Sequence, residues 1–262
     1  MKMRTLVVIA IIALLAAARA PAQSVLFDLD NAPLHTSLPI DLATGGVTAH
    51  FSATGQGFSI QRANTMGFTP AGFSGFCIYP NSVFAADLLV GFSETLTNFS
   101  ILYAPQELGC DDSARMKVSA YMNGALVGTN LCTANSPGTW PSETLSFGST
   151  EGFNSVVIHY DDRPPTCQDW GPIFLADNMA VTLAPPPIIL TNAAKLADGA
   201  FQFAFTNTPG RSFSVLGATN LSMPFTNWTL LGGVAEGAPG QFQFTDTQAT
   251  NGLKCFYKVR SP

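Results

Sequence analysis

Charged side chains are scarce in this chain, and basic ones are scarcer than acidic ones. The 262 residues include 12 Lys and Arg and 17 Asp and Glu, so that 11% are charged, well below the usual quarter. Beyond residue 22 the balance is 9 basic against 17 acidic side chains. An acidic chain of this kind is repelled by nucleic acid and by anionic membranes, so neither is expected as a partner.

Motifs for catalysis and for metal binding are also missing. The three histidines, His35, His50 and His159, are scattered, without the His-Glu-x-x-His spacing of a zinc enzyme, and the five cysteines form no CxxC pair. The segment Gly72-Phe73-Ser74-Gly75 falls one residue short of the G-x-S-x-G nucleophile motif. These absences favour a protein that is not an enzyme, and they leave the question open.

One uncharged apolar run stands at the start of the chain. Lys2 and Arg4 precede the apolar residues 6–17, and alanines follow up to Ala22. This order is typical of a cleaved secretory signal peptide, and the run is too short to span a membrane comfortably. We expect residues 1–22 to be removed. Because the next cysteine is Cys77 and no apolar tail ends the chain, we expect no lipid or transmembrane anchor. A secreted, periplasmic or cell-surface location follows.

The cysteines have a different meaning in an exported chain. Five of them predict one or two disulfides and at least one remaining thiol. Cys110 and Cys167 both lie in polar, loop-like contexts, where a cross-link between loops is most useful, so we expect these two to form a disulfide.

Helical periodicity is missing too, since no window of 12 or more residues after the apolar run has it. Short runs rich in β-branched and aromatic residues predict strands instead, and the clearest are residues 47–52, 87–92, 99–103, 117–122 and 155–160. Asn123-Gly124 is a strong hairpin signal. Short strands separated by Gly, Pro and Asn predict an all-β fold, a sandwich or jelly roll.

Three consecutive prolines, residues 185–187, mark a domain boundary because they form a stiff spacer that cannot join a sheet. Residues 23–184 hold 14 acidic and 4 basic side chains, whereas residues 188–262 hold 3 and 5. The second segment contains strictly alternating runs at 200–206 and 241–245. We therefore expect a jelly-roll domain over 23–184 and a small immunoglobulin- or fibronectin-like β-sandwich over 188–262.

Several short motifs occur in order through the second domain. They are Pro209-Gly210, Ala218-Thr219-Asn220-Leu221, Asn227-Trp228-Thr229, Phe244-Thr245-Asp246 and Phe256-Tyr257-Lys258-Val259-Arg260. Together they resemble the C-terminal β-sandwich modules of secreted proteins from environmental bacteria. The resemblance covers most of residues 190–262 and implies a spacer or attachment module without catalysis of its own.

The ends of the first domain carry a second resemblance. Residues 25–28 form an opening strand, residues 174–181 form a closing strand, and Trp140 precedes a strand at 144–147. This pattern is similar to the galactose-binding-like, carbohydrate-binding-type jelly rolls of exported bacterial proteins. The resemblance implies that the first and last strands lie near each other and often share a structural calcium ion.

Four oxygen-bearing side chains at these strand ends are the candidate calcium ligands. They are Asp28, Asp30, Asp177 and Asn178, and calcium prefers carboxylate, amide and carbonyl oxygens. The alternative is that these residues cap turns and loops, where Asp and Asn are favoured in any case.

Aromatic side chains in polar loops are the remaining sign of ligand binding. Carbohydrate-binding sandwiches stack exposed Trp and Tyr rings on sugars, with carboxylates and amides completing the hydrogen bonds. Trp170 with Asp169, Trp140 and Tyr103 are the candidate ligand-binding residues, and packing in the core is the alternative for each ring.

The sequence thus predicts an exported, non-catalytic binding or adhesion module whose partner is a polysaccharide, a cell-surface glycan or extracellular matrix. Two alternatives stay open. One is a polysaccharide hydrolase that uses an acidic pair, Asp111 with Asp112 or Asp161 with Asp162, because glycoside hydrolysis needs two carboxyl groups. The other is a structural surface protein without a ligand.

Overall fold

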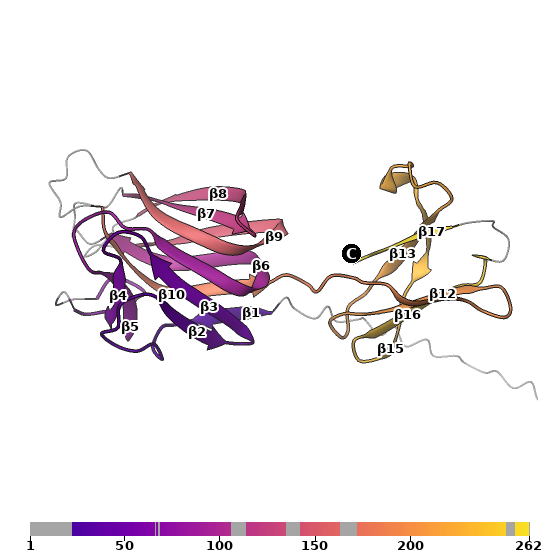
Figure 1. Ribbon diagram of the computed structural model, residues 1–262, viewed down its shortest axis with the longest axis horizontal. Coiled ribbons are helices and arrows are strands. Elements are labelled where there is room, and N and C mark those ends of the chain that lie inside the picture. Colours follow the sequence, from indigo (N-terminus) through magenta and orange to yellow (C-terminus); the bar gives the residue numbers. More distant parts are fainter. Residues whose placement is uncertain are drawn as a thin grey trace, which may run out of the picture. The chain divides into compact units, whose positions relative to one another are not determined.

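The computed structural model describes residues 23–65, 67, 69–105, 114–134, 142–162, 172–249 and 255–261. Strands make up almost all regular structure in these segments, with one short 3-10 helix, η1 (Phe225–Asn227). The prediction of an all-β protein is confirmed (Figure 1). None of the described residues forms a helix long and apolar enough to cross a membrane. The predicted signal peptide, residues 1–22, lies outside the described residues.

The described residues divide into two compact units between Ala184 and Pro185. The first unit contains β1 (Ser24–Phe27), β2 (Ile40–Thr44), β3 (Val47–Ala53), β4 (Phe58–Arg62), β5 (Phe76–Pro80), β6 (Leu88–Pro105), β7 (Arg115–Met122), β8 (Ala125–Thr133), β9 (Glu143–Asp162) and β10 (Phe174–Leu183). All of these belong to one antiparallel sheet.

Two long strands fold this sheet into two layers. The first part of β6 pairs with β3 and with the end of β9, whereas its second part pairs with β10 and with the start of β9. Between the two parts of β6 the register of its pairing with β9 shifts, and Gly152 in β9 adopts a φ of +79°. One layer therefore runs β2-β3-β6-β9-β7-β8, and the other holds β4, β5, β10, β1 and the remaining halves of β6 and β9.

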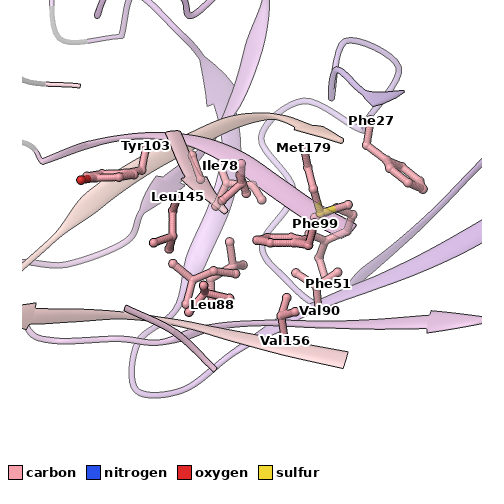
Figure 2. Close-up of a cluster of buried hydrophobic side chains, with 14 of the residues drawn as sticks. Phe27, Phe51, Ile78, Leu88, Val90, Phe99, Tyr103, Leu145, Val156 and Met179 are labelled. Carbon is pink, nitrogen blue, oxygen red and sulfur yellow. The ribbon is translucent and has the colours of Figure 1, made fainter. Parts of the chain in front are cut away.

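The core of the first unit lies between these layers. Alternate residues of each strand point inward, as in the buried–exposed pattern of β3, because successive side chains in a strand face opposite sides. Phe51, Val90 and Val156 come from one layer and meet Ile78 and Met179 from the other (Figure 2). This contact between layers makes the unit a β-sandwich.

Two features of the first unit, the β7–β8 hairpin and the pairing of β1 with β10, agree with the sequence. Asn123 and Gly124 have φ of +51° and +83° and join β7 to β8, which confirms the predicted hairpin. β1 pairs with β10 from Ser24 opposite Thr182 to Phe27 opposite Met179. The first and last strands of the unit thus lie side by side, as the sequence resemblance implied.

The described residues of the second unit form seven strands in two sheets, β11-β12-β16-β15 and β14-β13-β17. They are β11 (Thr191–Lys195), β12 (Phe201–Thr206), β13 (Ser214–Ala218), β14 (Thr229–Gly233), β15 (Ala235–Ala238), β16 (Gln241–Asp246) and β17 (Phe256–Arg260). Phenylalanines fill its core, since Phe203, Phe205, Phe213 and Phe242 are all nearly inaccessible to solvent. The alternating runs predicted as strands are β12 and β16, which pair with each other.

Candidate functional site

A pocket of about 310 Å³ opens at the side of the first unit, where β1 and the turn after it approach β2. Ten residues line it: Leu26, Phe27, Asp28, Leu29, Asn31, Ala32, Asp41, Leu42, Ala43 and Thr44. A volume of this size lies at the small end of the range of ligand sites in proteins. It suits a compact ligand rather than a large cofactor.

The topology explains why a pocket forms there. β1 pairs only with β10, and β2 pairs only with β3, so each is an edge strand among the described residues. The chain leaves β1 at Phe27, and Leu29 then takes a φ of +62° with its side chain buried, which turns Asp28 and Asn31 toward the surface. Edge strands present backbone N–H and C=O groups that need no partner within the sheet, so backbone groups as well as side chains can contact a ligand here.

The lining is rich in hydrogen-bonding oxygens and has no basic residue. Asp28 and Asp41 supply carboxylates, and Asn31 supplies an amide that both donates and accepts. Leu26, which is 54% exposed, and the half-buried Leu42 add apolar surface. One ligand could therefore form hydrogen bonds through its hydroxyl groups and apolar contacts through its C–H groups in this pocket.

Both pocket carboxylates also have contacts within the protein. Asp28 Oδ1 accepts a hydrogen bond from the Asp30 backbone N–H at 3.2 Å. His50 Nδ1 lies 2.7 Å from Asp41 Oδ1, and the two side chains are 55% and 67% exposed. Exposed ion pairs add little stability, so Asp41 can exchange this contact for one with a ligand at small cost.

The candidate calcium ligands lie close enough to influence each other, and one of them, Asp28, also lines the pocket. Asp177 is fully buried; its carboxylate accepts N–H groups of Ser74 at 3.1 Å and Asn178 at 2.7 Å. Burial, with smaller contributions from the negative charges of Asp30 and Asp28, raises the pKa of Asp177 to about 7, although the two N–H groups act to lower it. Burial and the neighbouring acids therefore favour the protonated form of Asp177 below neutral pH.

The contacts of these residues match loop capping. Asp30 Oδ1 accepts the Phe76 N–H at 2.8 Å, and Asn178 Nδ2 donates to the Gly72 carbonyl at 3.1 Å. Across the described segments, no group of three or more His, Cys, Asp or Glu side chains is arranged to hold a metal ion. The donor types suit calcium, but the arrangement does not enclose one, so no step of the proposed function depends on it.

The prediction that Tyr103 binds a ligand is wrong. Tyr103 is fully buried in the core, and its hydroxyl donates to the Cys132 carbonyl at 3.2 Å, so its ring cannot stack on a sugar. Its place in the alternating pattern of β6 turns it inward. Trp140, Asp169 and Trp170 lie outside the described residues.

The predicted disulfide also falls outside the described part of the chain, since neither Cys110 nor Cys167 is included in it. The described cysteines, Cys77, Cys132 and Cys255, are free thiols. Burial raises the pKa of Cys77 to about 12, with a further contribution from the charge of Asp177. This thiol is neutral and inert at ordinary pH.

Asp161 belongs to one of the two acidic pairs predicted as candidates for catalysis, and its surroundings do not favour that role. Asp161 accepts hydrogen bonds from Arg115 Nε at 2.9 Å and Lys117 Nζ at 3.2 Å. The Arg115 hydrogen bond, followed by that of Lys117, lowers the pKa of Asp161. A general acid for glycoside hydrolysis needs a raised pKa. Asp111 and Asp112 lie outside the described residues.

Sequence reasoning missed Asn31, Asp41 and Leu42 as site residues, although Asp28 was named for another role. Asp41 stands between Ile40 and Leu42 in a strand-like alternation, which indicates only that it faces solvent. What makes it part of a pocket is the approach of two edge strands that lie apart in the sequence, and no local pattern encodes this approach.

No family model matches the chain, and no curated protein matches it. Among solved structures, it is similar to the K2 adhesin domain of Lys-gingipain, with 13% identity, a TM-score of 0.37, and coverage of 51% of this chain and 90% of that one. It is also similar to the K1 adhesin domain of Lys-gingipain from Porphyromonas gingivalis W83, with 12% identity, a TM-score of 0.35, and coverage of 62% of this chain and 98% of that one. For the CBM22-1–CBM22-2 tandem domain from Paenibacillus barcinonensis Xyn10C, the identity is 10%, the TM-score is 0.27, and the match covers 94% of this chain and 92% of that one. Similarity at this level adds no argument about function.

Proposed function

We propose that this chain is an exported, non-catalytic binding module and that the pocket between β1 and β2 binds carbohydrate. In this proposal residues 1–22 are a signal peptide, the first unit is a jelly-roll-type ligand-binding domain, and the second is an immunoglobulin- or fibronectin-like spacer. The observation that supports it is the pocket itself, with hydroxyl-binding oxygens beside apolar side chains at an open edge.

Carbohydrate suits this lining better than other small ligands. A sugar ring presents hydroxyl groups around its rim and C–H groups on its faces. Asp28, Asn31 and Asp41 can accept from or donate to the hydroxyls, while Leu26 and Leu42 can contact a ring face. A volume of about 310 Å³ accommodates about one sugar unit, so the pocket is suited to one end of a glycan chain.

Binding of the full chain to arrayed plant, algal and microbial polysaccharides tests the proposal. Ala43→Phe places a bulky ring in the lining and should abolish binding, and Asn31→Ala should weaken it about tenfold, the effect of one or two lost hydrogen bonds. Ala125→Phe is the matched control, since Ala125 is exposed and does not line the pocket. Binding that survives Ala43→Phe, or no binding by the parent chain, would refute the assignment.

Calcium remains a separate proposal for Asp28, Asp30, Asp177 and Asn178. If a calcium ion binds there, it lowers the repulsion among the carboxylates and should raise the melting temperature of the full chain. The measurement is a thermal melt with chelator and with excess calcium. An unchanged melting temperature would leave loop capping as the role of these residues.

A further inference from the structure

The charges that line the same pocket indicate which class of carbohydrate it binds. This inference rests on the proposed carbohydrate-binding function. Asp28 follows β1 directly and Asp41 stands in β2, so the two bordering segments each contribute a carboxylate. None of the ten lining residues is Lys, Arg or His. A ligand in this pocket therefore meets two negative charges and no positive charge from the lining.

The surroundings increase this negative potential. Asp30 is exposed and lies two residues from Asp28, so its carboxylate adds to the negative potential. Residues 23–184 as a whole carry 14 acidic and 4 basic side chains. Concave sites lined by charge of one sign concentrate ligands of the opposite sign and repel those of the same sign. His50, the base in contact with Asp41, offsets this only in its protonated form.

We propose that the pocket binds glycans bearing free amino groups, such as a glucosamine polymer, in preference to neutral glycans, and excludes uronic acid and sulfated sugars. The sugar ammonium would approach Asp28 and Asp41, and Asn31 and Thr44 would bind neighbouring hydroxyls. The binding step is non-covalent, and the charge of the ligand decides its selectivity.

Asp41 is 67% exposed, so solvent screens each ion pair and the expected preference is moderate. Two exposed pairs together should favour a glucosamine tetrasaccharide over a glucose tetrasaccharide of the same linkage about five- to tenfold at low salt. The preference should shrink as ionic strength rises, because salt screens exposed charges. A glucuronic acid oligomer should bind more weakly than the glucose oligomer.

Isothermal titration of the full chain with these oligosaccharides is the test. Asp28→Asn and Asp41→Asn remove one charge each with little change of shape, and the amide introduced by Asp28→Asn would keep a side-chain oxygen for the Asp30 N–H. Each should bring the ratio of glucosamine to glucose affinity closer to one while glucose binding persists. Glu94→Gln removes an exposed charge that does not line the pocket and should preserve the ratio.

The outcomes separate the two levels of the proposal. Equal affinities of the parent chain for the two tetrasaccharides, or a ratio that both Asp→Asn variants leave unchanged, would overturn the charge inference while carbohydrate binding stands. No binding to these or to any arrayed polysaccharide would overturn both. A salt-sensitive preference for glucosamine that both Asp→Asn variants reduce would support both.

Discussion

At the scale of single residues, Asp177 has an unusual place in this fold. Its carboxylate is fully buried and accepts two backbone N–H groups, one from Ser74 in the loop before β5 and one from Asn178 in β10. It therefore fastens that loop to the strand that borders β1. Burial and the nearby acids raise its pKa to about 7, so the folded state holds this proton up to neutral pH.

The raised pKa of Asp177 predicts a pH dependence of stability. Between the ordinary value of about 4 and about 7, the folded chain binds more protons at this site than the unfolded chain, so its contribution to stability falls as pH rises through this window. Asp177→Asn removes the titration. From about pH 5 to about pH 8 the wild type should lose on the order of 2 kcal/mol more than the variant.

The measurement is urea unfolding of both proteins at the two pH values. At the lower pH, Asp177→Asn itself should cost about 1–2 kcal/mol, because the two N–H groups go to different oxygens of Asp177 and the amide would replace one of these with an NH2 group that donates. Glu94→Gln, at an exposed acid, is the control and should follow the wild type at both pH values. Parallel loss of stability in wild type and Asp177→Asn would contradict this account of the carboxylate.

Thiol reactivity gives another prediction at this scale. Cys77 is fully buried and its pKa is raised to about 12, whereas Cys132 and Cys255 are half-buried. Because the thiolate is the reactive form, iodoacetamide should leave Cys77 unmodified in the folded chain and modify it fully after denaturation. Peptide mass spectrometry measures both states. The same digest, run without reduction, would show whether Cys110 and Cys167 are linked.

The site residues show what single-sequence reasoning can and cannot reach. The proximity of Asp28 and Asp177 was implied by the resemblance of their strands to the first and last strands of a jelly roll, and β1 does pair with β10. The prediction for Tyr103 is wrong, because a ring next to a predicted loop suggests exposure, whereas the alternation of β6 continues through it and turns it inward. Asp41 and Asn31 were not identified because their role depends on an approach between distant segments.

At the scale of elements, β6 and β9 show the same limit. The sequence predicted two strands, residues 87–92 and 99–103, where the structure has one strand, Leu88–Pro105. Ser93, Glu94 and Thr95 between them are exposed and polar and look like a loop in sequence. In the fold they are the bend at which the strand passes from one layer to the other, which no local propensity distinguishes from a turn.

The bend in β9 predicts an unequal effect of two glycine substitutions. A Cβ at Gly152 would lie 2.6 Å from Thr95 Cγ2, at a φ of +79°. A Cβ at Gly124, with a similar φ of +83°, would meet nothing within 4 Å. Gly124→Ala should therefore cost about 1 kcal/mol from backbone strain alone, and Gly152→Ala about 2–4 kcal/mol, because steric overlap is added. Equal losses in chemical unfolding would show that the bend has no steric restriction at Gly152.

At the scale of the whole molecule, the two units have separate cores. Each cluster of buried apolar residues found in the described segments draws its members from one side of the Ala184–Pro185 boundary. Prolines 185–187 form the connection, and proline lacks the N–H that would let a sheet continue across it. A chain built in this way should unfold in two steps rather than one.

Calorimetry with one core variant in each unit tests this expectation. Phe242 is 2% exposed and stacks on Phe205 with ring centroids 5.2 Å apart, so Phe242→Leu should cost about 1–2 kcal/mol. For a unit of this size the loss lowers its transition by roughly 5–15 °C and leaves the other in place. Phe51→Leu, at a fully buried position of the first core, should move only the other transition. A pocket ligand should stabilise the same transition that Phe51→Leu lowers, since Asp41 and Phe51 belong to the paired strands β2 and β3. A single transition that responds to both variants would show that the two units unfold together.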